Sequence, residues 1–165
     1  MICIRPANTG DLDALCTLYY EFHEFHVRGV PDRLRSQGDL DRLDFTRLKE
    51  TLTDIMRGDD STVLIAEISG SVAGLAEVYL REDNPANALI ASHRYGYLQS
   101  LVVTQAFRRQ HIGQQLVEAA QRWARQKGAA EMKLDVWEFD AGPLRFYEKA
   151  GYRTLKRTLI KELER

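Results

Sequence analysis

The stretch LQSLVVTQAFRRQHIG, residues 98–113, decides the architecture of this chain. Its first six residues are mostly apolar and predict a β-strand that ends near Thr104. A short turn and two arginines follow, and a helix is expected to begin near Ile112 and Gly113. The apolar residues of that helix recur at the spacing of one helical face: Ile112, Leu116, Ala119, Ala120 and Trp123. The segment therefore reads as a strand, an arginine-bearing loop and a helix.

This order of elements favours the binding of an anion. The N-terminus of a helix presents unpaired backbone N–H groups and about half a positive charge. The guanidinium groups of Arg108 and Arg109 are expected beside it. A di-anion such as a pyrophosphate suits this combination. The simpler alternative is a surface turn with two solvated arginines.

Two common phosphate-binding motifs do not occur in the sequence, namely G-x-x-x-x-G-K-[ST] and G-x-G-x-x-G. The pattern R-x-x-G-x-[GA] does match, from Arg108 to Gly113, and Val103 stands five residues before it. His111 replaces the first glycine of the pattern. This loop resembles the coenzyme A loop of the GNAT superfamily of N-acetyltransferases.

A second segment carries the same resemblance. An alternating stretch at 131–137 predicts a strand, FDAGPLRFYEKAGY follows at 139–152, and a final strand is expected at 154–160. The segment is similar to the closing pattern of the superfamily, V-x-x-x-N-x-x-A-x-x-F-Y-x-x-x-G-F. The residues that fall on its register are Val136, Asp140, Phe146, Tyr147, Gly151 and Tyr152. The resemblance covers residues 95–163, and Asp140 stands where asparagine is usual.

The expected elements give an α/β fold, with one mixed sheet flanked by helices. The expected strands are 2–5, 62–68, 71–80, 98–103, 131–137 and 154–160, and the first two helices carry apolar stripes over 12–22 and 45–56. Asn8 and Asp11 are spaced as a capping box before the first helix. The order β-α-α-β-β-β-α-β-α-β is the one that the GNAT superfamily shows.

Length and composition are those of an ordinary globular protein. The 165 residues predict a single domain, 1–165, and the net charge of −1 gives no basic field for nucleic acid. Cys3 and Cys16 form no C-x-x-C pair, and no apolar run approaches the ~18 residues of a membrane span. We expect a cytoplasmic protein that binds neither nucleic acid nor membrane; the sequence leaves a homodimer open.

The resemblance implies that acetyl-CoA is the co-substrate. Its pyrophosphate would lie on the loop 108–113 and on the first N–H groups of the next helix. Its pantetheine arm would pair with backbone groups of the preceding strand, where the spacing of Leu98 and Leu101 predicts a β-bulge. The expected cofactor-binding residues are Leu101, Val102, Val103, Arg108, Arg109, Gln110, His111, Ile112, Gly113, Gln114 and Asp140.

Transfer of an acetyl group to an amine needs a proton acceptor, donors for the oxyanion and an acid for the thiolate. By resemblance Tyr147 is the acid, although it would also fit as a core aromatic. A backbone N–H near Val102 or Val103 would stabilise the oxyanion. Gln99 stands where many relatives carry a glutamate, and an amide is no base. Glu77 is therefore the candidate base, with a water chain or another group as the alternative.

Two departures from the family pattern concern the cofactor. Asp140 is expected to cap the last helix near Pro143, because an ionised carboxylate has no proton to donate to the cofactor. His111 keeps its backbone N–H, but the local conformation must suit a residue with a Cβ. The ring of His111 either contacts a phosphate or faces the solvent.

The end of the first helix and the charged segment 28–43 are expected to form one wall of the acceptor pocket. The candidate substrate-binding residues are Glu21, Glu24 and Gln99. The two carboxylates suit a cationic amine, whereas the arginines interleaved in 28–43 also allow a mobile surface loop. His23 and His26 could share a helix face, but no third ligand is spaced to join them. No metal is therefore expected.

These features predict an N-acetyltransferase that moves an acetyl group from acetyl-CoA directly to a primary amine of a small molecule. The first alternative is an enzyme that acetylates a protein lysine or N-terminus, which would need an open groove rather than a closed acidic pocket. The second is a coenzyme A-binding module without catalysis, which the departures at Gln99, His111 and Asp140 keep open and Tyr147 argues against.

Overall fold

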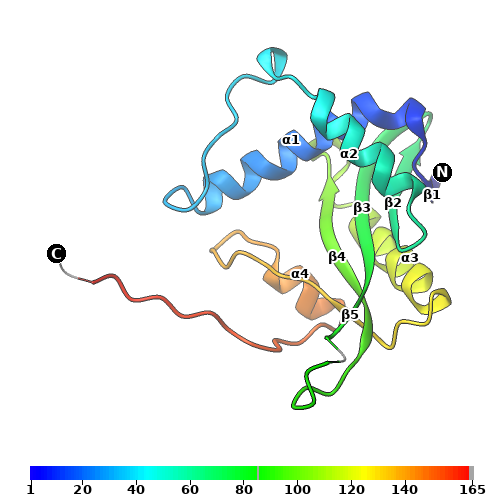
Figure 1. Ribbon diagram of the computed structural model, residues 1–165. Coiled ribbons are helices and arrows are strands. Elements are labelled where there is room, and N and C mark those ends of the chain that lie inside the picture. Colours follow the sequence, from blue (N-terminus) through cyan, green and yellow to red (C-terminus); the bar gives the residue numbers. More distant parts are fainter. Residues whose placement is uncertain (85, 164–165) are drawn as a thin grey trace.

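A five-stranded sheet with the strand order β1-β2-β3-β4-β5 forms the centre of the molecule (Figure 1). The computed structural model describes residues 1–84 and 86–163. The strands are β1 (Ile2–Pro6), β2 (Ser61–Ile68), β3 (Ser71–Glu82), β4 (Arg94–Val103) and β5 (Glu131–Lys133), and the helices are α1 (Leu12–Gly29), α2 (Thr46–Arg57), α3 (Ile112–Gln126) and α4 (Leu144–Lys149). Neighbouring strands are antiparallel except for β4 and β5, which are parallel. The mixed α/β sheet expected from the sequence is confirmed.

Helices cover both faces of this sheet. Val63 and Ile65 of β2 belong to the core beneath α1 and α2, whereas Leu64 and Ala66 belong to the core beneath α3 and α4. Successive side chains of a strand point to opposite faces, so β2 is buried on both sides. No helix within the described ranges is long and apolar enough to cross a membrane.

The first helix begins at the expected capping box. The side chain of Asn8 accepts a hydrogen bond from the N–H of Gly10 (2.8 Å), and the carboxylate of Asp11 accepts one from the N–H of Asn8 (2.8 Å). The box caps a short 3-10 turn that leads into α1. Hydrogen bonds from the Arg5 guanidinium hold the pKa of Asp11 below its usual range.

Strand β4 contains the expected bulge. Glu77 of β3 pairs with Ser100, and the next residue, Val78, pairs with Leu98, so Gln99 is an extra residue in β4. Because of it, Leu98 and Leu101 lie on the same face and both pack in the core beneath α3 and α4. A bulge bends its strand and increases the local twist.

Strands β4 and β5 pair only where they begin. Their register joins Tyr95–Tyr97 to Glu131–Lys133 and ends there. From Leu98 onward, β4 is paired within the described chain on its β3 side alone. One edge of β4 is therefore left open where the two strands separate.

Two expectations about the C-terminal part are wrong. The strand expected at 131–137 pairs only as far as Lys133, and the strand expected at 154–160 is no strand in the described chain. Residues 153–163 are exposed and run away from the sheet (Figure 1, red). Alternating side chains specify an extended backbone, but a strand also needs a partner, which this pattern does not supply.

Candidate active site

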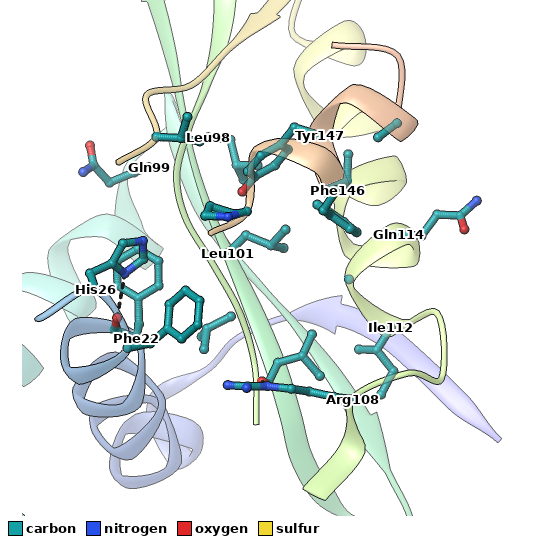
Figure 2. Close-up of a pocket in the computed structure, with 18 of the residues that line it drawn as sticks. Phe22, His26, Leu98, Gln99, Leu101, Arg108, Ile112, Gln114, Phe146 and Tyr147 are labelled. Carbon is teal, nitrogen blue, oxygen red and sulfur yellow. Dashed lines mark hydrogen bonds between the residues drawn. The ribbon is translucent and has the colours of Figure 1, made fainter. Parts of the chain in front are cut away.

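A cavity of about 1250 Å³ lies between α1, β4, α3 and α4 (Figure 2). Its walls include Phe22 and His26 of α1, Leu98 and Leu101 of β4, Ile112 of α3 and Tyr147 of α4. The open edge of β4 belongs to this cavity, because Leu98, Gln99 and Leu101 all line it. The cavity therefore joins the loop expected to hold an anion to the strand edge expected to hold an extended ligand.

One end of the cavity is the N-terminus of α3. The first helical hydrogen bond runs from the N–H of Gln115 to the carbonyl of His111 (3.1 Å), so the N–H groups of Ile112, Gly113 and Gln114 have no partner within the helix. These three residues line the cavity together with Arg108, Arg109 and His111. Unpaired donors and two guanidinium groups thus surround the same space, which suits an anion.

His111 adopts a left-handed backbone conformation, which glycine would enter without the steric cost of a Cβ. Its φ of 58° and ψ of 17° lie in the left-handed region, and Arg109 has a φ of 63°. Histidine enters this region more readily than most residues, but a Cβ still makes it costly. The expectation that the loop would suit a residue with a Cβ is wrong, since the backbone keeps a glycine-like turn and bears the strain.

Two residues of β4 direct their backbone groups toward the open edge. The N–H of Thr104 donates to the carbonyl of Ala73 in β3 (2.9 Å), whereas the carbonyl of Val103 accepts from Nε of Arg108 (3.1 Å) on the other side. Backbone groups of successive strand residues point to opposite edges, so Leu101 has the same orientation as Val103. The N–H and C=O groups of both residues are therefore placed to pair with an extended ligand.

Tyr147 forms part of the wall on α4. Its side chain is only 7% exposed and packs against the rings of Phe146 and Tyr152. Its hydroxyl is directed into the cavity (Figure 2), and no described residue forms a hydrogen bond with it. Burial, with the charge of Tyr152 as a smaller cause, raises the pKa of Tyr147 above its ordinary value. The group stays protonated at neutral pH, as an acid must.

Glu77 is buried and does not belong to the cavity lining in the described chain. Its carboxylate accepts hydrogen bonds from the hydroxyls of Tyr19 (2.6 Å), Tyr79 (2.6 Å) and Ser100 (3.0 Å). Burial and the nearby charge of Glu77 raise the pKa of Tyr19, which keeps that hydroxyl a donor. The role of Glu77 as a base stays a prediction, and the carboxylate would have to act through one of these hydroxyls.

Helix α1 supplies the wall opposite α4. Glu21 lines the cavity and accepts a hydrogen bond from the hydroxyl of Thr104 (3.0 Å). Nδ1 of His26 lies 2.8 Å from the carbonyl of Phe22. A carbonyl can only accept, so Nδ1 carries the proton and Nε2 of the neutral ring is left as an acceptor.

Glu24, the second acidic candidate on α1, faces the loop after this helix. Its carboxylate accepts a hydrogen bond from the N–H of Gln37 (2.9 Å). Tyr20 and His23 make further side-chain hydrogen bonds to backbone carbonyls of the same loop. Leu34 of this loop lines the cavity, so Glu24 shapes the wall without itself contacting the space.

The sequence patterns missed several cavity residues. Asp135 and Trp137, which follow β5, line the cavity, and the carboxylate of Asp135 accepts a hydrogen bond from the Tyr97 hydroxyl (2.7 Å). The signal was present, because these residues alternate with the half-buried Leu134 and Val136. His26 lies at the end of the first helix, which is expected to form a wall of the acceptor pocket, but its spacing from His23 does not show that its own ring lines the cavity.

Two expected cofactor residues, Gln110 and Asp140, are not among the described residues that line the cavity. The capping role of Asp140 is wrong. Helix α4 begins at Leu144 after Pro143, and no side chain caps its N-terminus. The helix starts one turn later than a cap at 140 requires.

One group of potential metal ligands lies outside the cavity. Oxygen or nitrogen atoms of Asp83, His93 and Glu131 are within 4.8 Å of one another. The ammonium group of Lys133 lies 3.2 Å from both carboxylates, so a cation of the chain already forms ion pairs with them. This group gives no reason to expect a metal.

A comparison with protein families finds a match over most of the chain. Residues 15–152 match the model of the "Acetyltransferase (GNAT) family". The chain is 28% identical over 149 residues to the uncharacterised N-acetyltransferase YhfO of Bacillus subtilis, which covers 90% of this chain and 88% of that protein. It is 26% identical over 107 residues to the aminoglycoside N(6')-acetyltransferase type 1 of Salmonella typhimurium, covering 65% of this chain and 72% of that protein.

The fold also resembles a solved structure over nearly its whole length. A tetramutant of the BH1408 protein of Bacillus halodurans superposes with a TM-score of 0.84 at 24% identity. The superposition covers 98% of this chain and 99% of that protein.

Proposed function

Because this chain belongs to the GNAT family of acetyltransferases, we propose that it moves the acetyl group of acetyl-CoA to a primary amine of a small cationic molecule. The family makes it an acetyl-CoA-dependent N-acetyltransferase. The observation that carries the proposed acceptor is the composition of the cavity. One end offers a helix N-terminus and two arginines, and the same cavity is lined by the carboxylates of Glu21 and Asp135.

The cofactor would occupy the cavity in an extended form. Its pyrophosphate would accept hydrogen bonds from the first N–H groups of α3 and from Arg108 or Arg109, and its pantetheine amides would pair with Leu101 and Val103. The thioester would then lie farther along β4, toward the bulge at Gln99. The N–H of Leu101 or Val103 is a candidate donor to the oxyanion, because both face the open edge.

The residues around the proposed position of the thioester suggest how protons would move during the reaction. The neutral amine attacks the thioester carbonyl, the C–S bond breaks, and the Tyr147 hydroxyl donates its proton to the departing sulfur. The proton lost by the amine would pass to a base, for which we place His26 ahead of Glu77. His26 lines the cavity with Nε2 as an acceptor, whereas Glu77 is enclosed by three hydroxyls.

A small acceptor is favoured over a protein by the loop after α1. Side chains of Tyr20, His23 and Glu24 fasten this loop to the helix, and Leu34 closes one side of the cavity. A peptide substrate needs an open groove, which this wall obstructs. One relative is named as an aminoglycoside acetyltransferase, which supports a small-molecule amine as the acceptor.

The experiment is a screen of amines by release of the free thiol of coenzyme A. Aminoglycosides, linear polyamines and lysine-containing peptides would be compared at equal concentration. We expect turnover with small polycations and at least tenfold lower kcat/KM with peptides. Preference for a peptide would favour the protein-acetylating alternative, and cofactor binding without turnover of any amine would favour the non-catalytic one.

A further inference from the structure

One aromatic ring connects the two walls of the cavity that carry the proposed base and the proposed acid. Phe139 lies in the segment between β5 and α4, and its ring packs against Phe25 of α1 (5.5 Å between ring centroids) and His26 of α1 (6.2 Å). Phe25 and His26 line the cavity, whereas Phe139 is not among the described residues that do so. The contact therefore supports the α1 wall from behind and does not fill the space for ligands.

Two glycines make room for the Phe139 ring. A Cβ on Gly29, the last residue of α1, would lie 2.5 Å from two atoms of this ring. A Cβ on Gly142 would lie 2.9 Å from the carbonyl oxygen of Phe139 and 3.2 Å from its ring. Neither glycine has a positive φ, so the backbone conformation does not demand glycine at these positions. The space that they leave is occupied by one ring, which joins α1 to the segment before α4.

The segment that carries Phe139 leads directly into α4. The N–H of Gly142 donates to the carbonyl of Phe139 (2.9 Å), which closes a turn, and α4 begins soon afterwards at Leu144. Helix α4 carries Tyr147, the proposed acid. Because the turn is short and hydrogen-bonded, the contact of Phe139 with α1 also determines where α4 starts relative to α1.

Aromatic rings surround the imidazole of His26. Its Nδ1 lies 2.8 Å from the carbonyl of Phe22 (Figure 2), and the rings of Phe22, Phe25 and Phe139 have centroids 4.5, 5.3 and 6.2 Å from its own. Phe25 and Phe139 meet it at 89° and 81°, close to the edge-to-face arrangement that aromatic pairs prefer. Phe22 and Phe25 belong to the same helix as His26. Of these three rings, Phe139 is the one that relates His26 to the rest of the cavity.

We propose that Phe139 is a positioning residue for acetyl transfer, because it holds His26 on α1 in register with Tyr147 on α4. This inference rests on the proposed function, in which the C–N bond forms and the C–S bond breaks while His26 takes the amine proton and Tyr147 gives its proton to the sulfur. The two groups act on the same reacting carbon from opposite walls of the cavity. A misplacement of about 1 Å in such a geometry can cost about 100-fold in rate.

The test combines two single substitutions with their double variant. Phe139→Ala removes the ring, and Gly29→Ala adds a methyl group where the ring lies, at a helical position that alanine favours. With the best amine of the screen, each should lower kcat about tenfold and change the KM of acetyl-CoA less than about threefold. In the double variant the methyl group meets no ring, so kcat should equal that of Phe139→Ala alone. Phe139→Leu, which keeps an apolar side chain in the space, should recover part of the rate.

Two substitutions away from the cavity are matched controls. Gly58→Ala places a Cβ against the side chain of Ser61 at the end of α2, and Phe45→Ala removes a phenyl ring before the same helix. Neither Gly58 nor Phe45 lines the cavity in the part of the chain that the structure describes. Both substitutions should lower Tm and leave kcat unchanged, which separates a loss of packing from a loss of positioning.

NMR of the histidine Cε1–Hε1 groups reports the position of the His26 ring without any substrate. The His26 signal, assigned with His26→Gln, should shift in Phe139→Ala and in Gly29→Ala, while the signals of His93 and His111 stay in place. An unchanged His26 signal in Phe139→Ala, or a kcat within twofold of wild type, overturns the inference. Failure of the proposed function has a different signature: the wild type turns over no amine although the His26 signal still shifts, and the assignment to acetyl transfer then falls with it.

Discussion

Nε of Arg108 donates a hydrogen bond to the backbone carbonyl of Val103, at 3.1 Å. The loop proposed to hold the pyrophosphate is thereby tied to the strand proposed to hold the pantetheine arm. The guanidinium group also lies over the ring of Phe25 on α1, 5.8 Å from its centroid, and so crosses the cavity. A cofactor amide that pairs with Val103 must displace this arginine, which would then be placed to meet a phosphate.

Two ligands distinguish the proposed contact of Arg108 with a phosphate from its hydrogen bond to the Val103 carbonyl. Arg108→Ala should raise the Kd of acetyl-CoA at least tenfold, since a charge-assisted hydrogen bond contributes about 1.5–3 kcal/mol. The Kd of S-acetylpantetheine, which has no pyrophosphate, should stay within threefold or fall, because the Val103 carbonyl is released. Calorimetry measures both. Arg125→Ala, which removes the same charge from an exposed position of α3, is the control and should change neither value.

Gly113 permits close approach of the cofactor to α3. A Cβ at this position would lie 3.4 Å from the Phe146 ring and 3.8 Å from the Val103 side chain, which is ordinary contact. Gly113→Ala should therefore fold and weaken acetyl-CoA binding only slightly. Gly113→Val adds two methyl groups and should raise the Kd at least tenfold while circular dichroism stays native. Unchanged binding by the valine variant would contradict the assignment of the pyrophosphate site.

Substitution of His111 by glycine should stabilise the folded protein. Glycine accepts the left-handed conformation without a Cβ, so His111→Gly should raise Tm by about 2 °C despite the greater freedom of the unfolded chain. Gln110→Gly, at a residue without a positive φ, should lower Tm instead. The Kd of acetyl-CoA should stay within threefold for His111→Gly if the backbone N–H groups bind the phosphates. A tenfold loss would assign the contact to the imidazole ring.

Substitution of Tyr147 tests whether the protein is an enzyme or a coenzyme A-binding module without catalysis. Tyr147→Phe keeps the packed ring and removes the proton, so kcat should fall about 100-fold with little change in the Kd of acetyl-CoA. The raised pKa of Tyr147 also predicts that the wild-type rate does not fall between pH 8 and 10 through loss of this proton. Tyr152→Phe, which removes a neighbouring hydroxyl, is the control. A kcat within twofold of wild type for Tyr147→Phe would leave Tyr147 a core residue.

Two substitutions identify the base. His26→Gln removes the free acceptor Nε2 and should lower kcat about 100-fold. Glu77→Gln should change kcat much less but lower Tm, because an amide N–H₂ would face hydroxyls that now donate to a carboxylate. The reverse result would make Glu77 the base.

The sequence was most informative where one local pattern determines the geometry. The bulge at Gln99 followed from the spacing of Leu98 and Leu101, and the start of α3 at Ile112 followed from the apolar periodicity. The resemblance to the GNAT superfamily then supplied the order of elements. These features depend on neighbours in the chain, and neighbours can be read from sequence.

The rest depended on contacts between distant residues. Glu77 is enclosed by Tyr19, which is 58 positions away and on another element. The alternation near Asp135 indicates which side of the strand it occupies, but it does not show that the Tyr97 hydroxyl donates a hydrogen bond to its carboxylate. The strand at 154–160 is expected because its residues suit an extended backbone, and only the structure shows that these residues pair with no strand of the described chain.

The bulge also means that the presence of one extra residue, Gln99, determines the shape of the cavity beside β4. Ser100 and Leu98 would alternate normally if Gln99 were deleted, so both cores could keep their side chains while β4 became straight. The edge of β4 would then stay closer to the residues after β5, and the slot for an extended thioester would narrow. With the cofactor placed along this edge as proposed, one inserted residue distinguishes a scaffold of this architecture from one that can admit its cofactor.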